Sequence, residues 1–89
     1  MSQARRRHIL DGDRSGGGHR FGAGQGKSEF PQNWSDQDII DAIEDVANDP
    51  SSTTMRARGG GIMLIGVRNS VSITTVVGTT NEILTGYPT

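Results

Sequence analysis

The sequence contains no cysteine, which excludes disulfide bonds, thiolate metal sites and a cysteine nucleophile. It also has no apolar run close to the roughly 20 residues that a transmembrane helix needs, so we expect no membrane partner. The first ten residues, MSQARRRHIL, lack the apolar stretch of a signal peptide. If the chain leaves a cell, we therefore expect another protein to carry it.

Apolar side chains are scarce as well. Hydrophobic residues make up 31% of the 89 residues, and aromatic residues only 4%. A chain this short buries a small core, so its stability is expected to be modest. We expect one domain over residues 1–89, supported by good local packing or by a partner.

The net charge of −1 hides an uneven distribution along the chain. Residues 1–27 carry a net charge of +4, residues 28–50 carry −7, and residues 51–89 carry +2. The basic first block holds both histidines of the chain, His8 and His19, and suits a partner that bears phosphates. The run Arg5 to Arg7 by itself is more typical of a solvated tail, so we expect residues 1–6 to be flexible.

A long glycine-rich stretch, residues 11–28, contains more than half of the 13 glycines. Long loops in compact domains are usually functional or disordered, and linkers seldom contain His, Phe, Lys and Arg together. We therefore expect residues 11–28 to form an active-site loop.

A helix is expected next. Ser35 is a suitable N-cap, Asp38 stands close to a capping-box position, and Trp34 can pack on Ile39 as a hydrophobic staple. One apolar stripe at helical spacing follows, and Asn48 to Pro50 end the helix. Its members are Ile39, Ile40, Ile43, Val46 and Ala47.

The remainder of the chain favours strands. Residues 61–69, 71–77 and 82–88 are rich in β-branched and apolar residues, and residues 53–58 could add a fourth strand. The turns between them are short, which requires antiparallel neighbours. The predicted fold is α+β, an antiparallel sheet of three to four strands with one amphipathic helix packed on it.

Two segments resemble known ligand-binding motifs, but each lacks a residue that the motif requires. DGDRSG (11–16) resembles the start of an EF-hand loop, but its twelfth position is Gly22 instead of a bidentate Glu. GAGQGKS (22–28) resembles a phosphate loop, but Phe21 stands where the first glycine is required. We discard calcium and nucleoside triphosphate binding.

The two histidines suit acid–base cleavage of RNA. RNA carries its own nucleophile, the 2′-hydroxyl, so the enzyme needs a base, an acid and a cation near the phosphate. An imidazole with a pKa of about 6.5 serves either role near neutrality. Backbone amides of glycines such as Gly17 and Gly18 can approach the phosphate closely. A metal-dependent hydrolase that uses His8, Asp11, Asp13 and His19, or a non-catalytic module that binds RNA or phosphate, are the alternatives.

Four segments carry a more specific signal. They are H-I-L-x-G-D from His8, G-G-G-H ending at His19, G-K-S-x-F-P-x-x-W-S from Gly26 and T-x-Y-P from Thr85. Together they resemble bacterial EndoU nuclease domains, the RNase modules at the C-termini of polymorphic and contact-dependent inhibition toxins. The resemblance implies a fold of the barnase–EndoU–colicin–RelE type. It also implies metal-independent transesterification at or near uridines, leaving a 2′,3′-cyclic phosphate and a 5′-hydroxyl, with no cofactor.

The resemblance also assigns roles. The two catalytic histidines of the family fall on His8 and His19, of which we take His19 as the base and His8 as the acid. The catalytic lysine falls on Lys27, with Arg58 as the substitute. Thr85 would read the base of the nucleotide, and Tyr87 would pack on its ribose. We expect Phe21, Phe30 and Trp34 to be packing residues.

The partners follow from the same resemblance. They are RNA, with tRNA as one possible class, a cognate immunity protein over the basic surface and an upstream delivery protein. Such a toxin domain would be secreted or delivered, and would act in the cytoplasm of the target cell.

Overall fold

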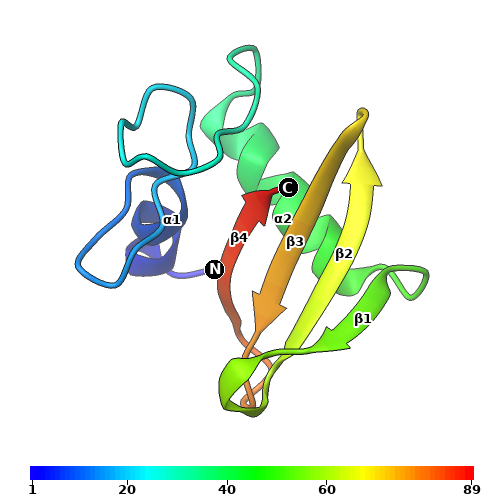
Figure 1. Cartoon of the computed structure of the whole chain (residues 1–89). Helices are drawn as coiled ribbons and strands as arrows, with labels where there is room; N and C mark the ends of the chain where they lie inside the picture. The colour runs from blue at the N-terminus through cyan, green and yellow to red at the C-terminus, as the bar shows by residue number, and fades with distance from the viewer.

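The computed structural model describes all 89 residues, Met1–Thr89. Two helices and four strands, with a short 3-10 turn after the first strand, make up the fold (Figure 1). In chain order they are α1 (Gln3–Leu10), α2 (Asp36–Asn48), β1 (Thr53–Arg56), η1 (Arg58–Gly60), β2 (Ile62–Arg68), β3 (Val71–Val77) and β4 (Ile83–Pro88). None of these helices has the length and apolar character that crossing a membrane requires.

The helix α2 forms as its local sequence predicts. The Ser35 hydroxyl accepts a hydrogen bond from the Asp38 amide at 3.0 Å, and the Asp38 carboxylate accepts one from the Ser35 amide at 2.9 Å. This capping box satisfies amides that the first helical turn leaves without partners. The apolar stripe of α2 is buried against the sheet.

The four strands form one antiparallel sheet in the order β1-β2-β3-β4, which confirms the predicted α+β fold. The turn at Asn69 and Ser70 joins β2 to β3, and both residues have positive φ angles of 49° and 66°. A two-residue turn with positive φ at both positions matches the twist of paired strands. The chain therefore folds back directly after Arg68.

The two faces of the sheet differ in what covers them. The Thr75 hydroxyl donates to the Ile43 carbonyl of α2 at 3.0 Å, so this face packs on α2. Tyr87 is opposite Thr74 in the β3–β4 register, and Thr85 is opposite Val76. Since neighbouring residues in a strand point to opposite faces, Thr85 and Tyr87 lie on the face that α2 leaves open.

The helix α1 differs from the expected flexible segment at residues 1–6. The Ser2 hydroxyl caps it by accepting from the Arg5 amide at 3.1 Å, and helix begins at Gln3. Arg5 also donates to the Leu84 carbonyl of β4 at 2.9 Å. At the other end of α1, Ile9 and Leu10 are buried in the core with α2. Tertiary contacts therefore stabilise a helix that its polar sequence does not predict.

Candidate active site

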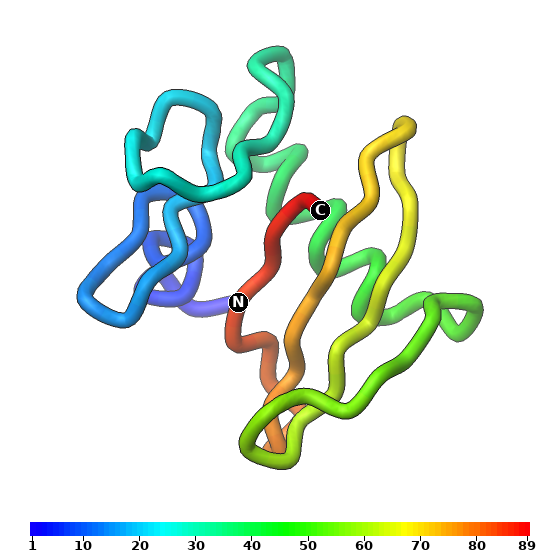
Figure 2. The backbone as a smooth tube through the Cα atoms, in the orientation of Figure 1, coloured from blue at the N-terminus to red at the C-terminus, as the bar shows by residue number.

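The glycine-rich segment lies along the C-terminal end of α1. The amides of Gly18, His19 and Arg20 donate to the carbonyls of His8, Ile9 and Leu10, at 3.0, 2.8 and 3.1 Å. The last carbonyls of a helix lack partners in the helix itself, although the His8 carbonyl also accepts from the Gly12 amide at 3.1 Å. Figure 2 follows the segment, light blue to teal, as it folds over α1 beside β4. These hydrogen bonds bring the backbones of His8 and His19 together.

Glycine is required where the two backbones meet. Gly17 has a φ of +78°, and a Cβ atom there would lie 2.0 Å from the His8 carbonyl oxygen. At Gly18, with a φ of +86°, a Cβ atom would lie 2.4 Å from the Gln25 side chain. The Gly18 amide already donates to His8, so it is not free to bind a phosphate as we expected from the sequence. In this structure the Gly18 amide joins the glycine-rich segment to the end of α1.

The His8 ring is fixed by a carboxylate. Its Nδ1 lies 3.0 Å from Asp13 Oδ1, and the hydroxyl of Ser15 donates to the same oxygen at 2.7 Å. The hydrogen bond from the Ser15 side chain, followed by that from His8, lowers the pKa of Asp13 to about 2. An ionised Asp13 accepts the Nδ1 proton of His8 and leaves Nε2 as the second ring nitrogen for chemistry.

Asp13 is a site residue that the sequence reasoning considered only as a metal ligand. The signal that could have found it is its position five residues after His8, at the end of H-I-L-x-G-D. A carboxylate so close along the chain can return to the ring across the tight turn that Gly12 makes with its φ of +88°.

The His19 ring is fixed by a backbone carbonyl and by a tyrosine. Its Nδ1 donates to the Ser28 carbonyl at 2.7 Å, and its ring centroid lies 5.6 Å from that of Tyr87, tilted by 33°. Burial is the largest effect on this ring and lowers the pKa of His19 below 6.5, and the positive charges of Lys27 and His8 lower it further. The hydrogen bond to Ser28 acts in the opposite direction. At neutral pH this imidazole is therefore neutral, with its Nε2 lone pair unprotonated.

The structure gathers most of the predicted site residues, but not all. Lys27 is exposed on the loop next to Ser28, close enough for its charge to act on His19. Tyr87 contacts His19, and Thr85 lies on the same open sheet face. Arg58 lies in η1, between β1 and β2, and the charges that lower the pKa of His19 are those of Lys27 and His8 and not that of Arg58.

Of the three expected packing residues, Phe30 is in the core, Trp34 packs against it, and Phe21 does neither. Phe30 is fully buried and stacks on Trp34, with ring centroids 5.6 Å apart. Phe21 is 51% exposed, so its prediction as a packing residue is wrong. The hydrophobicity of a residue in a glycine-rich loop does not reveal whether the loop turns it inward or outward.

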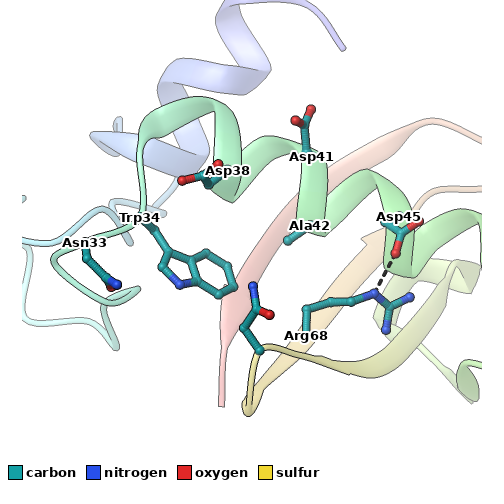
Figure 3. Close-up of a pocket in the computed structure, with 8 residues that line it drawn as sticks. Asn33, Trp34, Asp38, Asp41, Ala42, Asp45 and Arg68 are labelled. Carbon is teal, nitrogen blue, oxygen red and sulfur yellow. Dashed lines mark hydrogen bonds and ion pairs between the residues drawn. The ribbon is translucent and has the colours of Figure 1, made fainter.

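A shallow cavity lies away from the histidines. It measures about 520 Å³ and is lined by the outer side of α2, Trp34 and the turn between β2 and β3 (Figure 3). Arg68 closes one side by donating from Nε to Asp45 at 2.5 Å. Neither His8 nor His19 lines any of the three cavities of the molecule, and each is only 7% exposed. The histidine site is therefore a surface site in which little more than the edges of the rings reach solvent.

The alternative of a metal-dependent hydrolase requires a set of ligands. No group of three or more histidine, aspartate or glutamate side chains is arranged to hold a metal ion. His8 and His19 each use Nδ1 within the protein, and Asp11 pairs instead with Arg20. The four residues named for that alternative do not form one site.

Comparison with known proteins decides the family. A family model described as bacterial EndoU nuclease matches residues 23–89, three quarters of the chain. The chain belongs to the bacterial EndoU nuclease family. This membership makes the domain a nuclease. No curated protein and no solved structure matches it.

The match does not extend over the first 22 residues of this EndoU domain. It covers Lys27, Arg58, Thr85 and Tyr87, and it begins after both histidines. Both histidines lie outside the matched residues, so their roles rest on the geometry that pairs His8 with Asp13, and His19 with Ser28 and Tyr87.

Proposed function

We propose that this EndoU domain is a metal-independent endoribonuclease that cleaves RNA at or near uridines. The observation on which the proposal rests is the hydrogen bonding of the two imidazoles. Each is anchored through Nδ1, one by a carboxylate and one by a carbonyl, on segments joined backbone to backbone. Each therefore keeps Nε2 for a proton transfer, and the two sites are close enough for the charge of His8 to act on His19.

The proposed reaction moves one proton at each histidine. His19 Nε2 takes the proton of the 2′-hydroxyl, and the 2′-oxygen attacks the adjacent phosphorus. The bond from phosphorus to the 5′-oxygen breaks, and His8 Nε2 gives its proton to that oxygen. The products are a 2′,3′-cyclic phosphate and a 5′-hydroxyl. The lowered pKa of His19 supports the base role, because the ring is neutral before the reaction.

The other residues bind and stabilise. Lys27 neutralises charge on the non-bridging oxygens of the phosphate, a role that suits an exposed cation on the loop next to His19. Thr85 and Tyr87 would hold the uridine on the open sheet face. Asp13 is a positioning residue, because it acts on His8 and not on the RNA.

The test uses variants that keep the anchoring hydrogen bond. In His19→Asn the amide nitrogen takes the place of Nδ1 and can still donate to Ser28, and His8→Asn keeps a donor for Asp13. Both remove Nε2, so we expect cleavage of a uridine-containing oligonucleotide to fall by at least about 100-fold in each. Far-UV circular dichroism and melting temperature control for the fold.

Assays in EDTA separate this proposal from its alternatives. We expect full wild-type cleavage in EDTA, and activity that returns only with a divalent metal would favour the metal-dependent hydrolase. Intact RNA with tight binding would favour a non-catalytic RNA- or phosphate-binding module. Wild-type rates in either asparagine variant would refute the assigned roles.

The biological setting we propose is that of a toxin. The domain would be delivered by an upstream protein into the cytoplasm of a target cell, where it cleaves RNA, with tRNA as one possible class. In the producing cell, an immunity protein would cover the basic surface around the histidines. Production of wild type and His19→Asn in a bacterial cytoplasm tests this, because only the wild type should arrest growth.

A further inference from the structure

Phe21 is the only aromatic side chain among the large hydrophobic residues exposed on this domain. It is 51% exposed, and the others are Met1, Met55, Ile62 and Val67. A single exposed hydrophobic residue is ordinary in itself. The position of Phe21 in the fold is what suggests a role.

Phe21 lies at the start of a loop whose base is the candidate active site. The Phe30 amide donates to the His19 carbonyl at 2.8 Å, and the His19 ring donates to the Ser28 carbonyl at 2.7 Å. The loop over residues 20–29 therefore begins and ends at His19. Phe21 is two residues beyond His19, so their Cα atoms are at most about 7 Å apart.

The backbone around Phe21 is held although its side chain is in solvent. The neighbouring Arg20 pairs with Asp11 and, at 3.2 Å, with Asp36 at the start of α2. The Ala23 amide donates to the Arg20 carbonyl at 3.0 Å and closes a turn around Phe21. An aromatic ring presented from an anchored backbone can bind a flat ligand with little loss of conformational entropy.

The surroundings of Phe21 suit a nucleotide. Lys27 projects from the same loop and supplies a cation for a phosphate. On β4, the ring of Tyr87 packs against the imidazole of His19. His19 thus has one aromatic residue, Tyr87, in contact with its ring and a second, Phe21, exposed two residues along the chain from it.

We propose that Phe21 stacks on the base of the nucleotide 3′ of the cleaved bond. This inference rests on the proposed function, in which Thr85 and Tyr87 hold the uridine and His19 acts at its 2′-hydroxyl. An RNA strand that leaves this position across the scissile phosphate reaches the loop that carries Phe21. Stacking on an aromatic ring tolerates any base, so Phe21 adds affinity without adding sequence preference.

Binding of uncleavable oligonucleotides tests the proposal directly. A short RNA with one 2′-deoxyuridine lacks the nucleophile, and its 3′ neighbour is either adenosine or an abasic residue. We expect Phe21→Ala and Phe21→Leu to weaken binding of the adenosine version by roughly 5- to 140-fold, the range for one stacked base. Phe21→Trp should bind as wild type does. On the abasic version, all four proteins should bind alike.

Two controls make the comparison specific. Met55→Ala removes a side chain that is 54% exposed on β1, at the sheet edge opposite β4, and should leave binding unchanged. An RNA that is abasic on the 5′ side of the uridine should keep the full effect of Phe21→Ala. The melting temperature of Phe21→Ala should equal that of wild type, because the side chain packs on little.

The outcomes separate this inference from the proposed function. If wild type cleaves RNA and Phe21→Ala matches it in affinity and KM, the inference alone is overturned. A wild type that binds through Phe21 and the 3′ base without cleaving overturns the proposed function and leaves the stacking role. A wild type that neither binds nor cleaves overturns both.

Discussion

The His19 imidazole shows how three surrounding elements determine the chemistry of one residue. The ring is nearly buried between the glycine-rich loop and β4, and this burial is the main reason that its pKa is below 6.5. The charges of Lys27 and His8 act in the same direction. The proposed base role requires an unprotonated imidazole, and a lowered pKa keeps His19 unprotonated at neutral pH.

Removal of the charge of Lys27 should raise the pKa of His19. We expect the ring proton signals of His19 in NMR to titrate below pH 6.5 in wild type and closer to 6.5 in Lys27→Gln. In wild type, kcat/KM should fall as the pH falls through this lowered pKa, because His19 then becomes protonated. Arg58→Gln is the control, since the charge of Arg58 is not among those that lower the pKa of His19. Identical titrations of wild type and Lys27→Gln would contradict this electrostatic account.

At the scale of elements, the glycine-rich segment is hydrogen-bonded to the C-terminal end of α1. Three consecutive amides of the segment pair with three consecutive carbonyls of the helix. This pairing requires the two backbones to approach closely, and Gly17 meets that requirement because it has no side chain. The same contact places His8 and His19 on adjoining segments.

Two glycine substitutions separate close approach from backbone conformation. Gly17 and Gly24 have similar φ angles, +78° and +74°, but a Cβ atom at Gly24 would meet nothing within 4 Å. Gly24→Ala should cost about 1–2 kcal/mol, the penalty of the left-handed conformation. Gly17→Ala should cost roughly 1–3 kcal/mol more, because the His8 carbonyl must move. Urea unfolding measures both, and equal losses would show that close approach is unimportant.

At the scale of the whole molecule, the packing of α2 on the sheet positions β4, the strand that carries Thr85 and Tyr87. A Cβ atom at Gly86 would lie 2.8 Å from three atoms of the Ile43 side chain. Ile43 is fully buried, so it has little room to move. Gly86 lies between Thr85 and Tyr87, and the contact with Ile43 therefore controls how far β4 lies from α2.

A double-mutant cycle tests this packing. Gly86→Ala should destabilise the domain by roughly 1–3 kcal/mol through overpacking, and Ile43→Val alone by about 0.5–1.5 kcal/mol. The double variant should lose less than the sum, because the shorter side chain makes room for the added methyl group, with a coupling above about 0.5 kcal/mol. Thermal or urea unfolding gives the free energies. Additive losses would mean that the two residues do not compete for space.

The parts predicted correctly from the sequence are those that depend on neighbours along the chain. The capping box at Ser35 and Asp38 and the apolar stripe of α2 are local patterns, and so is the short turn between β2 and β3. Residues two apart in a strand share one face, so the spacing of Thr85 and Tyr87 by itself places them on the same face. Each of these features has a period or a spacing that is readable within about ten residues.

The parts that the sequence did not predict depend on distant contacts. α1 has no marked apolar stripe, and it is held by β4, the core and the amides of residues 18–20. The exposure of Phe21 follows from the path of the loop that the chain takes after His19. No local pattern encodes either feature.

The sequence by itself therefore determined the residue types of the site, the helix α2, the antiparallel sheet and the resemblance to EndoU nucleases. Only the tertiary structure decided that Asp13 anchors His8, that Ser28 and Tyr87 hold His19, and that Phe21 remains in solvent. The physical reason is the separation along the chain of the residues that interact. Hydrogen bonds and hydrophobic periodicity along one element are local, whereas the environment of an imidazole is formed by segments that meet only when the chain has folded.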